Sequence, residues 1–307
     1  MHIKIGTRAS RLALWQAEYR QQFLQDGGLT SELVLIETKG DQILDRSLAK
    51  IGSKGVFTQE LEDQLRVGSI DIAVHSAKDL QSSLPADLGI IAFTEREQAN
   101  DVLVSRNKTL SLTSGQAFVI GTSSTRRVAM LKQYAPHLHV VDMRGNLQTR
   151  LRKLDEGQCD ALLLAYAGVH RMEYDDLIAE HLSLSEFTPA VGQGSVAIEA
   201  ANKLPTDKLD AIRQLTNHEP TETCLTAERA YLRRLEGGCS IPVFALATWV
   251  GQDVSLTGGI ISLDGTQLLR ETFTGPPGEA EQLGQQLAEH VLAMGGQEIL
   301  LSIREQL

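Results

Sequence analysis

The feature that most constrains the fold is the alternation of short apolar runs with amphipathic helical patterns along the first two-thirds of the chain. Apolar runs of strand length cover 2–8, 32–38 and 70–76, and a helical pattern at 57–69 ends near Gly68. A chain that alternates in this way forms a mostly parallel sheet covered by helices. The polar run HSAKD at 75–79 follows the third strand, at the edge of the sheet where such folds bind ligands.

The first helix is predicted directly after the first strand. Ser10 precedes an apolar series at helical spacing, which is formed by Leu12, Trp15, Tyr19 and Phe23. Serine is a preferred residue at helix N-termini, because its hydroxyl accepts a hydrogen bond from a backbone N–H of the first turn. We therefore expect Ser10 to cap this helix.

The same alternation starts again after about residue 100. Strands are predicted at 117–123, 139–145 and 159–168, the last of them nearly all apolar, as in a strand buried on both faces. Ser123 and Ser124 lead from the first of these strands into a helix, and Asn146 leads from the second. A second α/β domain is expected here.

The remaining sequence suggests a hinge and a third domain. Two segments, 94–101 and 188–195, separate the α/β halves and would cross between them. After residue 217 the sequence pattern changes. A helix is followed by alternating runs with turn signals and then by an amphipathic C-terminal helix, which together predict an α+β module. The predicted domains are 1–95 with 195–214, then 100–189, then 217–307.

Composition excludes several classes of function. The 307 residues carry a formal net charge of −10, which disfavours binding to nucleic acid or to an anionic membrane. The N-terminus has no signal-peptide pattern, and no run approaches 18 apolar residues. We therefore expect a cytoplasmic protein, and three widely spaced cysteines, at 159, 224 and 239, argue against a disulfide framework.

Basic side chains gather where predicted strands turn into helices. Guanidinium groups bind carboxylates through two parallel hydrogen bonds, and helix N-termini add further N–H donors. No phosphate-binding loop of the G-x-x-x-x-G-K-[ST] type occurs, so a small ligand with several carboxylates is favoured over a nucleotide. The residues concerned are Lys78 and the arginines Arg8, Arg126, Arg127, Arg144, Arg150 and Arg171.

Two further motifs are set aside. The run VGQGSVA, 191–197, satisfies the dinucleotide fingerprint G-x-G-x-x-A, but it follows TPA and not an apolar strand, so a turn is favoured over a nicotinamide site. His137 and His139 lie close together without acidic or thiol partners nearby, so no metal site is expected.

Asp79 and Cys239 are the candidates for chemistry. A carboxylate held at a strand end can stabilise a developing cation or transfer a proton; the alternative for Asp79 is a helix N-cap. Cys239 follows Gly237 and Gly238, which allow a sharp turn that would expose the thiol. It is then a nucleophile or an attachment point, and a buried structural thiol is the alternative.

The chain is similar to the hydroxymethylbilane synthases, also called porphobilinogen deaminases. The resemblance extends from residue 5 to 239 and rests on motifs in the family's order, although Arg11, Gln59 and Ala77 depart from its common pattern. The motifs are IGTRASRLALWQ, TKGD, AKIGSKGVFTQELE, DIAVHSAKD, GTSSTRR, RGNLQTRLRKLD, PAVGQG and TAERAYLRRLEGGC.

The resemblance implies two doubly wound, hinged domains like those of type II periplasmic binding proteins, with a smaller α+β domain. It implies a transferase that condenses four porphobilinogen molecules, with loss of ammonia, onto a covalent dipyrromethane cofactor, and then releases linear hydroxymethylbilane for haem and porphyrin biosynthesis by hydrolysis. No metal, membrane or nucleic-acid partner is implied, and a monomer is expected.

Residue roles follow from the matching motifs. Cys239 would carry the cofactor through a thioether, and Asp79 would be the catalytic carboxylate beside the pyrrole nitrogens. The carboxylates of cofactor and substrate would be bound by Arg8, Ser10, Ser76, Lys78, Thr122, Ser123, Ser124, Arg126, Arg127, Arg144, Arg150 and Arg171.

Two other classes compete with this interpretation. A non-catalytic carrier of dicarboxylates would also have two lobes and a basic cleft, but it predicts export or a fused DNA-binding segment and leaves LEGGC unexplained. A thiol-dependent hydrolase would need a histidine beside Cys239, and none of the eight histidines lies in a motif that suggests it.

Overall fold

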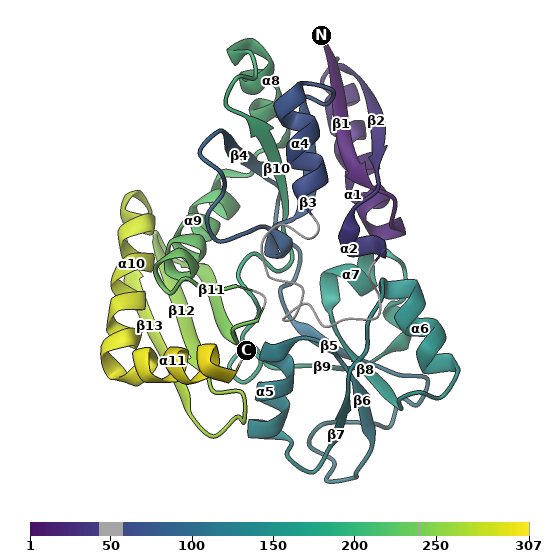
Figure 1. The fold of residues 1–307 in the computed structure, drawn as a ribbon, viewed down its shortest axis with the longest axis vertical. Helices are drawn as coiled ribbons and strands as arrows, with labels where there is room; N and C mark the ends of the chain where they lie inside the picture. Colours follow the sequence, from purple (N-terminus) through teal and green to yellow (C-terminus); the bar gives the residue numbers. More distant parts are fainter. Residues whose placement is uncertain (43–57, 239, 307) are drawn as a thin grey trace. The chain divides into compact units, whose positions relative to one another are not determined.

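The first unit contains a five-stranded sheet with helices on both faces. The structure, a computed structural model, describes residues 1–42, 58–238 and 240–306 (Figure 1). These fall into two units, the first built from the described parts of 1–45, 54–97 and 195–223. Its strands, in the order β2-β1-β3-β10-β4, are β1 (His2–Arg8), β2 (Thr30–Ile36), β3 (Ile72–Ser76), β4 (Leu88–Phe93) and β10 (Val196–Ala201).

One strand of this sheet runs against the other four. β1 pairs in parallel with β2 and β3, whereas β10 is antiparallel to both β3 and β4. The sequence predicted a mostly parallel sheet, and the reversed strand is the one that enters from the second crossing segment. The helices of the first unit are α1 (Arg11–Asp26), α2 (Lys39–Gln42), α4 (Gln59–Val67) and α8 (Thr206–Thr216).

The side chains of β3 show how the two faces are covered. Ile72 and Val74 pack in one cluster with residues of α1 and α8, while Ala73 packs in another with residues of α4. Alternate residues of a strand point to opposite faces, so helices on both sides are needed to bury them. The fold is therefore doubly wound, and the C-terminal end of β3 is left for polar residues.

Helix α1 begins as predicted but buries a different face from the aromatic series. The Ser10 hydroxyl accepts a hydrogen bond from the Ala13 N–H at 3.4 Å, as an N-cap does. Tyr19 and Phe23, however, are 46% and 38% exposed, and their rings are part of a row on the outer side of the helix. The buried face is formed by Ala13, Gln16, Ala17, Arg20 and Leu24.

The second unit begins with another sheet of the same design. Four of its strands run in one direction and β5 is reversed, with the order β7-β6-β8-β5-β9. Its elements are β5 (Asp101–Val104), β6 (Val119–Gly121), α5 (Thr125–Tyr134), β7 (His139–Val141), α6 (Leu147–Asp155), β8 (Ala161–Ala165), α7 (Tyr166–Arg171) and β9 (Ile178–His181). Residues of α5 pack on one face of the sheet and residues of α6 and α7 on the other.

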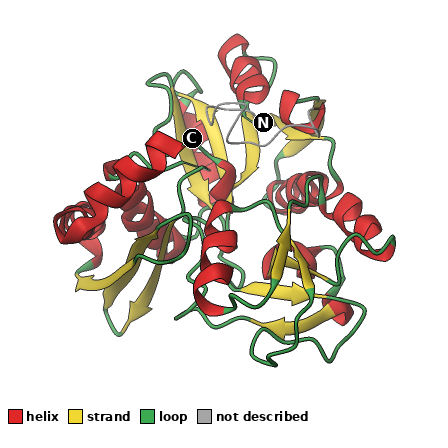
Figure 2. Ribbon diagram, turned by 60° about the horizontal axis from the view of Figure 1, so that its bottom comes forward, coloured by secondary structure: helices red, strands yellow, loops and turns green. Residues whose placement is uncertain are grey.

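The C-terminal part adds an antiparallel three-stranded sheet that is covered by helices (Figure 2). The predicted single C-terminal helix is wrong: it is two helices, because the chain breaks at Gly295, whose φ of 112° is unfavourable for other residues. The elements are α9 (Glu219–Arg234), β11 (Val243–Val250), β12 (Asp253–Ile261), β13 (Leu268–Gly275), α10 (Ala280–Val291) and α11 (Gln297–Gln306).

The expected fold class is thus confirmed, with two α/β sheets followed by a smaller α+β part. The division into three domains at the predicted boundaries stays a prediction. Among the helices that the structure describes, none combines the length and the apolar character needed to cross a bilayer.

Candidate active site

A polar pocket lies where β1 and β3 end in the first unit. Asp79 is exposed and belongs to a short 3-10 turn, Ala77–Asp79, that directly follows β3. Four of the predicted residues are in the lining, and Lys78, which is half-buried in the same turn, is outside it. The lining consists of Arg8, Ser10, Leu12, Ala13, Gln16, Thr58, Val74, His75, Ser76 and Asp79.

Hydrogen bonds fix the pocket's hydroxyl groups. The Gln16 side-chain amide donates to the Ser76 hydroxyl at 3.0 Å, which joins the buried face of α1 to the end of β3. Ser10 is already engaged as the cap of α1. Asp79 is the only acidic side chain in the described lining, and Arg8 is the only guanidinium group in it. The pocket therefore presents one carboxylate and one cation to a ligand.

One lining residue, His75, forms a buried pair with a glutamate. His75 Nε2 lies 3.0 Å from an oxygen of Glu199, and the two side chains are 3% and 0% exposed. Sequence reasoning missed Glu199, because it reaches β3 only through the antiparallel pairing of β10, which comes more than 100 residues later. A glutamate inside the apolar run VAIEAA was the available signal.

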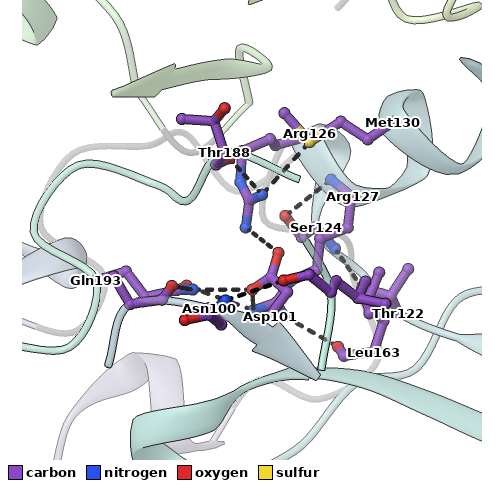
Figure 3. Close-up of polar contacts among 12 residues, drawn as sticks. Asn100, Asp101, Thr122, Ser124, Arg126, Arg127, Met130, Leu163, Thr188 and Gln193 are labelled. Atoms are coloured by element: carbon purple, nitrogen blue, oxygen red, sulfur yellow. Dashed lines mark hydrogen bonds and ion pairs between the residues drawn. The ribbon is translucent and has the colours of Figure 1, made fainter. Parts of the chain in front are cut away.

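The second unit contains a buried ionic cluster around Asp101 at the start of β5 (Figure 3). Asp101 is fully buried and accepts hydrogen bonds from Arg126 at 2.8 Å and from Arg127 at 2.7 Å. Gln193 donates to the same carboxylate at 2.9 Å. The two arginines also donate to the backbone carbonyls of Thr188 and Leu163. The sequence singled out the arginines but not their shared carboxylate.

Burial and the two guanidinium groups act in opposite directions on Asp101. Burial by itself raises the pKa of this carboxyl group, but the charges of Arg126 and Arg127 outweigh it and hold the pKa well below its ordinary value. Burial also lowers the pKa of Arg126, in spite of Asp101. Two guanidinium groups that share one carboxylate thus leave a buried excess of positive charge.

The other predicted hydroxyl groups lie in the turn between β6 and α5. Ser124 caps α5 by accepting from the Arg127 N–H at 3.4 Å, and the Ser123 hydroxyl accepts from the Met143 N–H at 3.1 Å. The Thr122 hydroxyl is buried and accepts from the Ser124 N–H at 3.4 Å. These three residues shape the turn from β6 into α5.

The remaining predicted arginines lie near the ends of β7 and β8. Arg150 on α6 donates through Nε to the carbonyl of Gly145 at 2.8 Å. Arg171, the last residue of α7, donates to the carbonyl of Gly194 at 2.7 Å. Arg144 is half-buried beside Gly145. All three thus belong to the second unit, together with Arg126 and Arg127.

These residues fit a ligand with several carboxylates. The Nε atoms of Arg126 and Arg127 are buried, and they have no hydrogen-bond partner in the part of the chain that the structure describes. A buried guanidinium N–H without a partner is costly, so an acceptor supplied by a ligand would be stabilised there. The donor set suits the carboxylates that the resemblance implies for cofactor and substrate.

The structure describes two of the three cysteines and both motifs that were set aside. Cys239 lies outside the described residues, while Cys159 and Cys224 are buried and form no disulfide with a described residue. The run VGQGSVA leads into strand β10 instead of a helix, as the turn interpretation expected. Among the residues described, no group of three His, Cys, Asp or Glu side chains could hold a metal ion.

Comparison with known proteins extends the similarity to nearly the full length of the chain. A family model described as porphobilinogen deaminase, dipyromethane cofactor binding domain, matches residues 3–207, and a second, porphobilinogen deaminase, C-terminal domain, matches residues 222–293. Among solved structures, a nutrient binding protein from Burkholderia cenocepacia bound to methionine is 13% identical, with a TM-score of 0.44, over 68% of this chain and 89% of that one.

Curated relatives are much more similar. The porphobilinogen deaminase of Cytophaga hutchinsonii is 58% identical over 305 residues, which cover 99% of this chain and 98% of the relative. That of Desulfosudis oleivorans is 52% identical over 307 residues, covering 100% and 99%. Identity this high extends over nearly the whole length of both chains, so it includes all the motifs and both units. The chain therefore belongs to the porphobilinogen deaminase family.

Proposed function

We propose that this chain is the transferase that condenses four porphobilinogen molecules, with release of ammonia, onto a covalently bound dipyrromethane, and then releases linear hydroxymethylbilane by hydrolysis. The observation that carries the proposal is the pocket at the end of β3, where Asp79 and Arg8 are the only carboxylate and the only guanidinium group in the described lining. Its residues come from the family's motifs, and the family model covers them.

Asp79 is suited to stabilise a cation. When ammonia leaves the aminomethyl group of porphobilinogen, positive charge develops on the substrate's pyrrole. A carboxylate that projects from a short turn behind a buried strand is held in place before the reaction, so it stabilises this charge without reorganisation. Arg8 would bind a carboxylate of the same pyrrole.

The second unit would hold the acidic side chains of the bound pyrroles. Arg126 and Arg127 are fixed by Asp101, and their Nε–H groups have no partner among the described residues, while Arg144, Arg150 and Arg171 lie near the ends of β7 and β8. Dipyrromethane, when bound, supplies the pyrrole to which the first substrate is joined, and Cys239 would attach it through a thioether. We also propose that the protein is a cytoplasmic monomer, and light scattering should give a mass near 33.6 kDa.

Intact mass spectrometry of the denatured protein tests the attachment. Wild-type protein is expected to carry one adduct of dipyrromethane mass, Cys239→Ser none, and the matched control Cys224→Ser the full adduct, since Cys224 is buried. The proteins that carry the adduct should release ammonia from porphobilinogen, and the variant without it should not. A wild type that stays unmodified and inactive after incubation with porphobilinogen would rule out the proposed function.

The role of Asp79 is tested by Asp79→Asn. We expect kcat to fall about 10²-fold or more, since the amide keeps the shape but loses the charge. The free energy of unfolding should change by less than about 0.5 kcal/mol, because Asp79 is exposed. Asp26→Asn, at the end of α1, is the control and should keep wild-type activity. Full activity of Asp79→Asn would contradict the assignment.

A further inference from the structure

His75 lines the Asp79 pocket, and the buried pair that it forms with Glu199 has no assigned role. In the antiparallel pairing of β3 with β10, His75 lies opposite Ala197, and Glu199 lies opposite Ala73. Residues two apart on a strand share a face, so His75 and Glu199 are diagonal neighbours on one face of the sheet. Their 3.0 Å contact therefore follows from the register of two central strands.

The contact determines which nitrogen of the imidazole is available. Glu199 is fully buried, one of its oxygens has no partner among the described residues, and the other is in contact with His75 Nε2. An ionised carboxylate accepts hydrogen bonds only, which puts a proton on Nε2. In the neutral ring the other nitrogen, Nδ1, is then an acceptor.

His75 is one of the residues that line the pocket together with Asp79 and Arg8. Its only described hydrogen bond is the one through Nε2. By contrast, the neighbouring Ser76 hydroxyl and Gln16 amide are bonded to each other. Among the polar side chains of this wall, His75 thus has an acceptor nitrogen left for a bound molecule.

We propose that His75 is a second proton-transfer residue of the pocket and that Glu199 is its positioning residue. The inference rests on the proposed function. In each condensation the C–N bond of the aminomethyl group breaks, with its electron pair leaving on ammonia. A C–C bond forms to the pyrrole that is extended, and the attacked pyrrole carbon loses its hydrogen as a proton. His75 Nδ1 accepts that proton and passes it to the released ammonia or to water.

Two roles in one group would conflict, which is why a second residue is needed. Asp79 stabilises the developing cation only while it is negatively charged, and accepting the proton would remove that charge. His75 can accept the proton while Asp79 remains ionised, and Glu199 stabilises the resulting imidazolium. Division of these tasks between two side chains keeps Asp79 negatively charged throughout the reaction.

The charged groups around His75 come from four elements. Glu199 lies on β10, Asp79 on the turn after β3, and Arg8 at the end of β1. Glu62 of α4 accepts a hydrogen bond from Thr58, which also lines the pocket. These charged groups are thus three carboxylates and one guanidinium group, and Glu199 is the one in described contact with the ring.

The test compares His75→Gln and Glu199→Gln with His137→Gln, which replaces an exposed histidine in the other unit. The holoenzymes are assayed for ammonia release from porphobilinogen between pH 5.5 and 9, and their adducts are weighed. We expect His75→Gln to carry the full adduct and to keep KM within a few-fold, while kcat falls about 10²- to 10³-fold. The acid limb of the wild-type kcat profile should disappear in this variant.

A second readout does not depend on turnover. In protein with ¹⁵N-labelled histidine, the resonance lost in His75→Gln should show the proton on Nε2 and should titrate at Nδ1 along the same acid limb. In Glu199→Gln the proton should no longer be held on Nε2, because the amide that replaces the carboxylate can donate as well as accept. If His75→Gln does not fold, the His75 resonance is assigned by elimination, through single replacements of the other seven histidines.

Either of two results would overturn the proposal. One is a His75→Gln holoenzyme with the kcat and pH profile of His137→Gln; the other is a wild-type ring that carries its proton on Nδ1 or does not titrate over the active range. Failure of the proposed function is distinct, because the wild type itself would then release no ammonia from porphobilinogen.

Discussion

At the residue scale, one carboxylate organises the second unit. Asp101 is the shared partner of two arginines and one glutamine, and the three donors come from α5 and from the segment that follows β9. Arg106 and Asp155 form a pair of the same chemistry at 2.9 Å, but both are exposed to water. The difference in solvation decides what each pair contributes, since removing one member of a buried pair leaves an uncompensated charge.

Asp101→Asn should therefore destabilise the protein by about 3–5 kcal/mol, because two buried guanidinium groups would lose their only described carboxylate. Asp155→Asn, the exposed counterpart, should cost less than about 1 kcal/mol. Urea denaturation of both variants checks the prediction. Similar losses in the two would contradict it.

The depressed pKa of Asp101 also sets a direction for acid stability. Because the folded-state pKa lies below the unfolded value of about 3.9, the contribution of Asp101 is complete above that pH and is lost as the pH falls further. The wild-type advantage over Asp101→Asn should thus be constant near neutrality and shrink below about pH 4.

At the element scale, close packing depends on a few residues without side chains. Glycine 284 on α10 faces α9: a Cβ atom there would lie 2.2 Å from the carbonyl oxygen of Ala227 and 2.9 Å from the Cβ of Ala230. The backbone of α9 cannot give way as a flexible side chain could. Contact between these two helices therefore requires glycine at this position.

Gly284→Ala should lower the free energy of unfolding by about 1–3 kcal/mol, even though alanine favours helices, because the added methyl group overlaps the backbone of α9. Gly278→Ala is the control, since a Cβ atom at that glycine has no neighbour within 4 Å among the residues described. Its effect should stay within about 0.5 kcal/mol. Thermal unfolding measures both, and a stabilised Gly284→Ala would contradict the packing argument.

At the scale of the whole molecule, the second unit is bound together by shared cores. Phe244 of β11 and Ile261 of β12 belong to the same apolar cluster as Met130 of α5 and Leu163 of β8. The C-terminal sheet and the second α/β sheet therefore bury side chains against each other, and we expect them to unfold together. Cys159 lies in a neighbouring cluster of the same unit and is buried.

Cys159 thus reports on the unfolding of this unit. Burial raises the pKa of its thiol to about 11, so the reactive thiolate is scarce at pH 8. We expect alkylation of Cys159 by iodoacetamide to be on the order of 100-fold slower in the native protein than in urea. Its rate should rise at the same urea concentration as the loss of tertiary structure around α5 and β11. Rapid native labelling would contradict this burial.

The sequence by itself determined the local elements, because each depends on neighbours in the chain. Ser10, Ser124 and Asn146 cap the predicted helices, Gly68 ends α4 with a φ of 77°, and the apolar strands are in place. Motif similarity supplied the family, which the comparisons confirmed, and it named Arg8, Ser10, Ser76 and Asp79, which line one pocket in the structure.

Only the tertiary structure decided the partners that make these residues useful. The carboxylate between Arg126 and Arg127 and the glutamate behind His75 come from strands that arrive from remote parts of the chain. The buried face of α1 could not be read from its aromatic residues either, since Tyr19 and Phe23 face outward. Strand register and helix rotation are set by the packing of whole sheets, and the free energy of that packing is not encoded in any single local pattern.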